Sequence, residues 1–310
     1  MTTTHPTPET AAPPLGDWTA WHLHLGTAAV SAADRVLRET VAPVVATLPG
    51  HDWFFIRYWQ GGPHVRLRVA DLTTEQVVAT TALLEESLRA SGAARDDETP
   101  LDVAAFGDEA ARHARAETGE NRVVADVRRL GVHPAVYEPE LARYGGAALM
   151  ASNEALFELS SRLVLAVLRS SPTRGQRAAT ALRATIAAAA ALGDAADQAV
   201  FYGIGLGAWR RWAEEFGYPA DAVRAALATS PETVAAVPVD PTAHGPFAPW
   251  HEAVRGLVDD VRALAPERHP GEIVSSQVHM THNRLGLGIL DELRTYALLA
   301  SAFPSSVATG

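Results

Sequence analysis

The stretch from Asp52 to Val69, DWFFIRYWQGGPHVRLRV, decides the fold. Two runs rich in aromatic and β-branched residues, WFFIRYW and HVRLRV, flank a glycine-containing turn, and this pattern is typical of a β-hairpin. The second run alternates, so that His64, Arg66 and Arg68 point to one face and the valines and leucine to the other. Such a face is usually exposed to solvent in an antiparallel hairpin, because buried charges are costly unless they bind a partner or a ligand.

Length and composition exclude several classes of protein. The chain has 310 residues, a net charge of −10 and no cysteine. The negative charge argues against general binding of nucleic acids or anionic membranes. The missing cysteines exclude disulfides, thiolate catalysis and cysteine-based zinc sites.

The N-terminal residues 1–16 have neither the basic nor the apolar segment of a signal peptide, and we expect a disordered leader there. No apolar run reaches membrane-spanning length without charged or glycine breaks. The sequence therefore predicts a cytoplasmic protein with a single domain over residues 17–310.

The first half of this domain, about residues 17–146, alternates strands and helices. The order strand, helix, strand, strand, helix predicts a ferredoxin-like α+β sheet. The expected elements are a strand over Trp18–Gly26, a helix over Ser31–Leu48 that breaks or kinks at Pro43, the hairpin, and a helix capped by Thr73 or Thr74 that ends near Ala90. A polar insertion over Ser91–Gly119, with a short helix over Val103–Ala114, and a strand-like run within Arg122–Val136 follow.

The second half, about residues 147–301, has helical periodicity throughout. The predicted helices are Ala147–Arg169, Arg174–Leu192, Ala195–Phe216, Ala220–Ala228, Trp250–Leu264 and Gly271–Ala300. Gly203, Gly205 and Gly207 alternate without a preceding strand, so they do not form a dinucleotide-binding motif. They indicate close helix packing or a loosened helix start.

Two further stretches concentrate polar side chains. YEPELARYGG, residues 137–146, places Glu140 and Arg143 three residues apart, a spacing that suits a surface ion pair before a Gly-Gly turn. SSQVHMTHNRLGLG, residues 275–288, places His279, His282 and Asn283 on one helical face. No carboxylate or third histidine lies within a turn, so we expect no metal there. A buried hydrogen-bonded histidine and a general acid or base remain the alternatives.

The VRLR strand, YEPELARYGG and the pattern SxxHMxxNR, in this order, resemble the C-terminal domain of lantibiotic dehydratases, which also occurs alone in thiopeptide biosynthesis. The resemblance spans about residues 18–299 and implies a sheet packed against a helical half. It implies that glutamate is eliminated from glutamylated Ser or Thr of a ribosomal precursor peptide with a leader, giving dehydroalanine or dehydrobutyrine. A separate glutamyl-tRNA-dependent protein would add the glutamate, so direct contact with nucleic acid is not expected.

The resemblance assigns the eliminating role to Arg68, Glu140, Arg143 and His279. The base would be His279, the arginines would bind carboxylates, and Glu140 would orient an arginine or the imidazole. Neither cofactor nor metal is required. The expected substrate-binding residues are Arg66, His64, Tyr144, His282, Asn283 and Arg284.

Two alternatives stay open within the same resemblance. Related stand-alone proteins are thiopeptide pyridine synthases, which join two dehydroalanines in a formal [4+2] cycloaddition and release the leader peptide. The insertion over Ser91–Gly119 favours this reading, because a larger substrate cleft would need extra elements. The other alternative is a non-catalytic peptide-binding subunit of a dehydratase complex.

Overall fold

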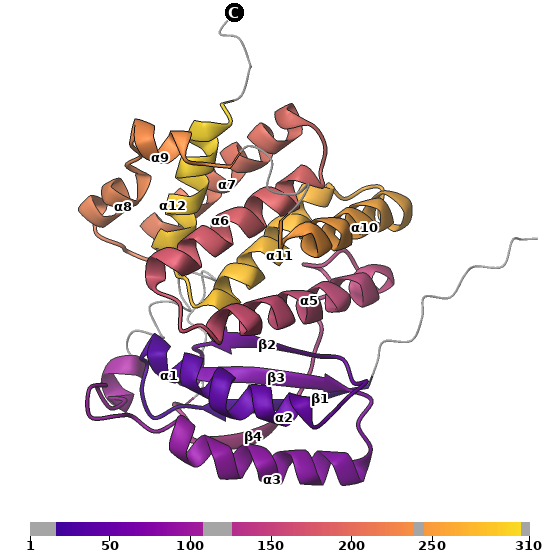
Figure 1. Cartoon of the computed structure of the whole chain (residues 1–310), viewed down its shortest axis with the longest axis vertical. Helices are drawn as coiled ribbons and strands as arrows, with labels where there is room; N and C mark the ends of the chain where they lie inside the picture. The colour runs from indigo at the N-terminus through magenta and orange to yellow at the C-terminus, as the bar shows by residue number, and fades with distance from the viewer. Residues whose placement is uncertain (1–16, 108–125, 239–244, 305–310) are drawn as a thin grey trace, which may run out of the picture.

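A computed structural model describes residues 17–107, 126–238 and 245–304. It shows an α+β half with a four-stranded sheet and a helical half stacked on one edge of that sheet (Figure 1). The expected α+β class is confirmed. The expected leader lies outside the described residues, as does most of the expected helix over Val103–Ala114, of which residues 103–107 are helical. Within the described part of the chain, none of the helices is long and apolar enough to span a membrane.

The sheet has the strand order β2-β3-β1-β4, and all neighbouring strands are antiparallel. Its strands are β1 (Trp18–His24), β2 (Trp53–Tyr58), β3 (His64–Ala70) and β4 (Gly131–Val136). With helices after β1 and β3, this is the predicted ferredoxin-like arrangement. The hairpin turn holds Gly61 at φ 78° and Gly62 at φ 104°, a left-handed conformation that side-chain-bearing residues rarely adopt.

One face of the sheet is covered by helices, and its core is apolar. The covering elements are α1 (Val30–Val36), a π-helical turn η1 (Leu37–Val41), α2 (Ala42–Ala46) and α3 (Thr74–Ser91) (Figure 1). The π-helical turn lies directly before Pro43, which lacks the N–H of a regular helix, so the expected break takes this form. Of the two caps predicted for α3, Thr73 is the one present, and it forms a capping box with Gln76.

The helical half begins with a short 3₁₀ turn and continues as a bundle. Its elements are η2 (Ala147–Leu149), α5 (Met150–Leu168), α6 (Arg174–Ala190), α7 (Ala195–Glu215), α8 (Ala220–Leu227), α9 (Pro231–Ala235), α10 (Ala248–Leu264), α11 (Pro270–Leu285) and α12 (Ile289–Ala302). The alternating glycines lie inside α7, and a Cβ at Gly205 would meet the ring of Tyr296 at 2.2 Å. Close packing of α7 on α12 therefore explains this glycine.

The predicted single helix over Gly271–Ala300 is wrong. The chain breaks after Leu285, where Gly286 takes the left-handed φ of 76° and ends α11, and α12 starts at Ile289. Helical periodicity continues on both sides of Gly286, so the sequence pattern alone did not indicate the break. The short α9 was also not expected.

Side chains of α5 and α11 complete the open edge of β2. Asn283 accepts a bond from the amide of Arg57 and donates to its carbonyl, both at 2.9 Å. Ser161 accepts from the amide of Phe55 at 3.1 Å, and Arg284 Nε donates to the carbonyl of Phe55 at 2.8 Å. These bonds satisfy an edge that would otherwise be exposed to other strands.

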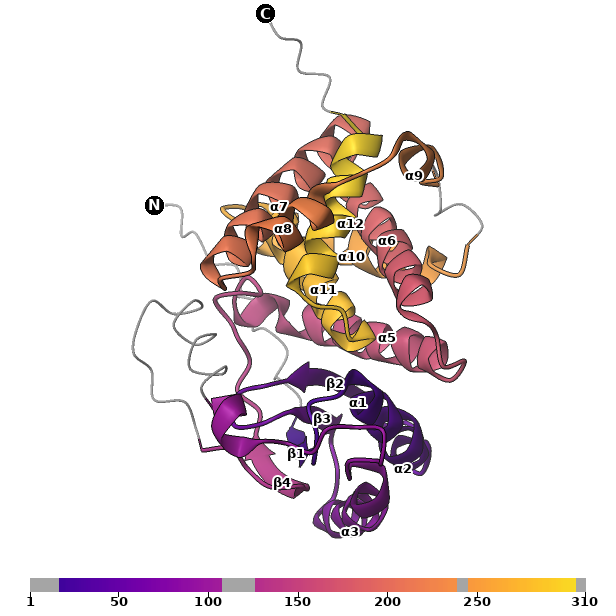
Figure 2. The same cartoon turned by 90° about the vertical axis from the view of Figure 1, so that its left-hand side faces the viewer.

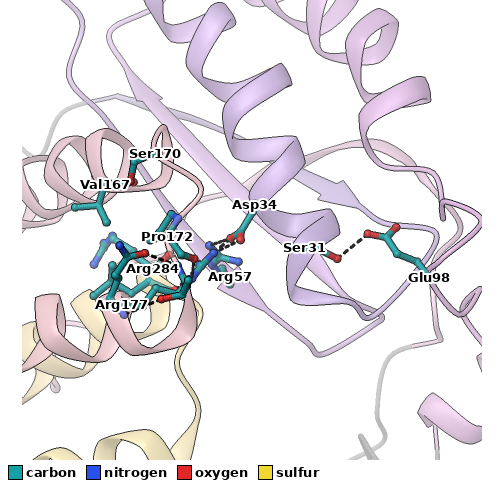
Figure 3. A network of polar contacts seen from close by, with 12 residues as sticks. Ser31, Asp34, Arg57, Glu98, Val167, Ser170, Pro172, Arg177 and Arg284 are labelled. Carbon is teal, nitrogen blue, oxygen red and sulfur yellow. Dashed lines mark hydrogen bonds and ion pairs between the residues drawn. The ribbon is translucent and has the colours of Figure 1, made fainter.

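A buried ionic network also joins the same two halves (Figure 3). Asp34 of α1 accepts bonds from Arg57 of β2, at 2.6 Å, and from Arg177 of α6. Although burial acts to raise it, the bonds from these arginines lower the pKa of Asp34. The sheet and the helical half are therefore tied by both backbone and ionic contacts.

Candidate active site

The sheet face opposite α1 to α3 carries a band of histidines and arginines. On β3 these are His64, Arg66 and Arg68, as the alternation predicts, and on β1 they are His22 and His24. The strand register pairs His24 with His64 and His22 with Arg66, so the side chains lie next to one another. Figure 2 shows that the chain leaving β4 climbs beside the sheet towards α5. It carries the YEPELARYGG stretch to this site.

Arg68 is a buried cation without an ion pair in the described part of the chain. It is 8% exposed, its Nε has no hydrogen-bond partner, and its guanidinium lies 5.1 Å from the ring of Phe54 and 4.9 Å from that of Tyr137. Burial, with the charge of Arg66, lowers the pKa of Arg68 to about 10. Such a group is stabilised by an anionic ligand.

Arg66 is a second cation on the same face, two residues before Arg68, and it is half-buried. Its guanidinium stacks 3.5 Å from the ring centre of Tyr58, and its Nε donates to His64 Nε2 at 3.1 Å. Burial lowers the pKa of Arg66. Neither arginine forms an ion pair with a carboxylate of the described residues, so together they offer paired donors for a carboxylate.

Arg143 and Tyr144 lie in the turn after β4. Arg143 forms the predicted ion pair with Glu140, at 3.1 Å, and its Nε donates to Ser276 of α11 at 3.3 Å. Tyr144 is buried, and burial raises its pKa, whereas the charges of Arg143, Arg284 and Arg68 act to lower it. The ring of Tyr144 therefore lies among several guanidinium groups. Glu140 orients an arginine and does not hold the imidazole of His279.

His279 is oriented by a carboxylate that the sequence analysis did not identify. Its Nδ1 lies 2.8 Å from Glu292 Oε1 of α12, and its ring lies 5.2 Å from that of Trp209 in α7. A carboxylate accepts hydrogen bonds, so Nδ1 carries the proton and Nε2 keeps its lone pair. The side chain is 31% exposed, which suits a base that meets a substrate.

The neighbours of His279 on α11 show which way it faces. Ser276, three residues before it, contacts Arg143, and Asn283, four residues after it, contacts the backbone of Arg57. Residues at these spacings share one face of a helix. His279 therefore lies on the face of α11 that meets the α+β half.

Three polar residues that follow in the HMTHNR stretch make contacts within the fold, and two of them, His282 and Arg284, are fully buried. His282 is fully buried and bonds Thr185, while Asn283 and Arg284 hold the edge of β2. Arg284 Nε donates to the carbonyl of Phe55, while the terminal nitrogens of Arg284 are buried without hydrogen-bond partners among the described residues. Burial lowers the pKa of Arg284 to about 9. The expected substrate contacts of these three residues find no support in this geometry and stay predictions.

His22, His24 and His64 form the one group of described residues in which three side chains could share a metal, with one ligand atom from each lying within 4.8 Å of the others. Burial, and the charges of nearby arginines including Arg66, lower the pKa of His22 to about 3 and that of His24 to about 4. These rings are therefore uncharged at neutral pH and chemically able to bind a transition metal. However, Arg66 already uses a lone pair of His64, and the surrounding guanidinium groups repel a divalent cation. The cluster fits an uncharged wall of an anion site better.

Three residues of the candidate site were missed from the sequence. His22 and His24 alternate in the first strand as the arginines do in the hairpin, and that alternation was a usable signal. Glu292 had no such signal, because it meets His279 only after the chain changes direction at Gly286, between α11 and α12.

Comparison with known proteins identifies a family and solved structures with a similar fold. The family model described as "Lantibiotic biosynthesis dehydratase C-term" matches residues 18–303. The pyridine synthase TbtD from thiomuracin biosynthesis is 19% identical, with a TM-score of 0.70 over 94% of this chain and 99% of that chain. No curated protein sequence matches significantly.

Two further solved structures share the fold. The tRNA-dependent lantibiotic dehydratase MibB from Microbispora sp. 107891 is 24% identical, with a TM-score of 0.53, and the match covers 97% of this chain and 28% of that one. TsrL is 16% identical, with a TM-score of 0.51 over 93% and 95% of the two chains. The family model covers nearly all of the described residues, and the chain belongs to the family of the lantibiotic dehydratase C-terminal domain.

Proposed function

We propose that this protein tailors a ribosomally made peptide by eliminating glutamate from its glutamylated Ser or Thr residues. The observation that carries this proposal is the pair Arg66 and Arg68, two desolvated cations that lack an ion pair within the described chain. A glutamyl ester brings carboxylate groups that such a pair can bind. The relatives, a lantibiotic dehydratase and a pyridine synthase of thiomuracin biosynthesis, support the peptide as the substrate class.

The proposed elimination assigns a role to each part of the site. His279 Nε2 removes the α-proton of the modified residue, and the electron pair of that C–H bond is held as the enolate of the adjacent carbonyl group. That pair forms the Cα=Cβ double bond as the Cβ–O bond breaks, and glutamate leaves as a carboxylate with the electron pair of the Cβ–O bond. Arg66 and Arg68 hold that leaving group, and Arg143, fixed by Glu140, stabilises the developing enolate. None of these steps requires a metal or cofactor.

The proposal implies two partners. One is the precursor peptide with its leader, and the other is a separate protein that adds glutamate from glutamyl-tRNA. The second is proposed because MibB, which shares this fold, is a tRNA-dependent lantibiotic dehydratase. Direct contact with tRNA would then belong to the glutamylating protein.

Pyridine synthesis is the second candidate. The pyridine synthase TbtD has this fold over 99% of its own length, so a protein of this size and architecture accommodates that reaction. In that case His279 would move protons during ring closure, and the arginine pair would bind acidic groups of the leader.

A peptide assay separates the two reactions. With a glutamylated precursor peptide, mass spectrometry should detect free glutamate and dehydrated residues. His279→Ala should slow this step by about 10²- to 10⁴-fold, because the α-proton loses its base. His251→Ala, at a histidine that bonds an α6 carbonyl, is the control and should keep wild-type turnover. An unchanged glutamylated peptide, together with a macrocycle and free leader from a bis-dehydroalanine substrate, would instead establish the pyridine synthase.

A further inference from the structure

A buried carboxylate lies between two imidazoles at the junction of α11 and α12. Glu292 is 1% exposed, with Oε1 2.8 Å from His279 Nδ1 and Oε2 3.9 Å from His282 Nδ1. Both Oε2 and His282 Nδ1 are buried and have no hydrogen-bond partner among the described residues. A buried carboxylate oxygen without a hydrogen bond lowers the stability of the fold, so its presence here suggests a functional role.

The hydrogen bonds of His282 define its protonation. Its Nε2 lies 2.9 Å from the hydroxyl of Thr185, and that hydroxyl donates its own proton to the carbonyl of Ala181 at 2.8 Å. Thr185 must therefore accept, and His282 carries its proton on Nε2. Full burial lowers the pKa of His282, so the ring is neutral at pH 7. Its Nδ1 lone pair then faces Glu292 Oε2.

It follows that Glu292 has a single donor within this group. His282 gives it neither a hydrogen bond nor a counter-charge, and the N–H of His279 is the one bond that compensates its charge. Arg143, from the turn after β4, acts on the same carboxylate from a greater distance, while Tyr296 is buried beside it in α12. A proton arriving at His279 Nε2 would convert this contact into a full ion pair in a site shielded from water.

We propose that Glu292 is the positioning residue for His279, and that Thr185 supports it by holding His282 in the tautomer that cannot donate to Glu292. Glu292 fixes the His279 proton on Nδ1, leaves Nε2 free to accept, and stabilises the imidazolium that forms. His282 acts through Glu292 and does not touch the substrate. The catalytic consequence rests on the proposed elimination, but the tautomer assignment does not.

The primary test replaces Glu292 by Gln, which keeps the size of the side chain and removes its charge. With the glutamylated peptide, kcat should fall by about 10²- to 10⁴-fold at nearly constant KM, because the substrate contacts are unchanged while the imidazolium loses its partner. Glu272→Gln removes a carboxylate from an exposed ion pair with Arg268 at the start of α11 and should keep wild-type kcat. A folded Glu292→Gln protein with wild-type kcat would overturn the positioning role.

The second readout is independent of turnover. Nitrogen-15 NMR of histidine-labelled protein should show His279 with its proton on Nδ1 and His282 with its proton on Nε2. Glu292→Gln should move the His279 signals towards a mixture of tautomers, since an amide can donate as well as accept. Unchanged His279 signals would refute the proposal whatever reaction the protein catalyses, whereas changed signals without glutamate release would refute only the elimination.

Thr185→Val provides a variant for the case in which Glu292→Gln does not fold. Valine has nearly the shape of threonine but accepts no hydrogen bond, so His282 is released to carry its proton on Nδ1 and donate to Glu292. Its signals should shift accordingly, and kcat should fall at constant KM. Retention of the Nε2–H tautomer in the folded variant would show that Thr185 does not hold His282.

Discussion

Replacing Arg68 by methionine should make the protein more stable and less active. The burial that lowers the pKa of Arg68 from 12.5 to about 10 corresponds to about 3 kcal/mol against its charged form. Cation–π contacts with the rings of Phe54 and Tyr137 offset about 1 kcal/mol of this cost. Methionine keeps an apolar stem of similar length, so we expect the free energy of unfolding to rise by about 1–2 kcal/mol.

The same change should remove binding energy for the substrate. A charge-assisted hydrogen bond to a carboxylate contributes about 1.5–3 kcal/mol, so kcat/KM for a glutamylated peptide should fall by about 10- to 150-fold. A gain in stability with a loss of activity is the behaviour of a residue retained for its ligand.

Arg177 supplies a matched control of opposite sign. It is also 8% exposed, but it bonds the carboxylate of Asp34 and the carbonyls of Pro172 and Leu285. Arg177→Met breaks a compensated network and should cost about 3 kcal/mol of stability, with kcat unchanged in the folded fraction. Urea unfolding followed by circular dichroism, together with peptide turnover, measures both effects. Equal destabilisation by the two variants, or wild-type kcat/KM in Arg68→Met, would refute the unpaired-cation argument.

Two further predictions concern packing and acid stability. Gly205→Ala should destabilise the protein by about 1–3 kcal/mol, because its Cβ would overlap the ring of Tyr296. Gly207→Ala has open space around it and should stabilise the protein by about 0.5–1 kcal/mol. Thermal melting of the two variants measures both effects, and equal shifts of the melting temperature would contradict the packing argument. Hydrogen bonds from Arg35 lower the pKa of Glu98 to about 2, so its contribution is present above the usual carboxyl pKa and is lost as pH falls towards 2. In Glu98→Gln the free energy of unfolding should change less with pH over that range. An unchanged slope would show that the pair of Arg35 and Glu98 does not determine the loss of stability in acid.

The features predicted from the sequence are those set by neighbouring residues. Strand alternation in the hairpin, a threonine cap before α3 and the ion pair between Glu140 and Arg143 are each encoded within a few positions, and all are present. The ferredoxin-like order also follows from the succession of such elements. The band of positive charge on the sheet was predictable for the same reason, because a period of two fixes its face.

The features that were missed depend on contacts between distant segments. Glu292 becomes the partner of His279 only through the reversal at Gly286, and periodicity alone does not reveal a reversal flanked by two helices of similar pattern. Asn283 and Arg57 are 226 positions apart, so the sequence offers no local sign that one completes the strand edge of the other. The substrate contacts expected of the polar residues in the HMTHNR stretch stay predictions, because the contacts that the structure shows for them lie within the fold.

These structural contacts bear directly on the proposed chemistry. The two catalytic elements lie on different halves, since Arg68 belongs to the sheet and His279 to the helices. Within a single turn of α11 from His279, Asn283 binds the backbone of β2, the strand that pairs with the one carrying Arg68. The register between β2 and β3 is fixed by their ladder, so the bonds of Asn283 set the position of the base relative to the anion site. The HMTHNR stretch thus holds both the proposed base, His279, and, four residues later, the asparagine that fixes its position against β2.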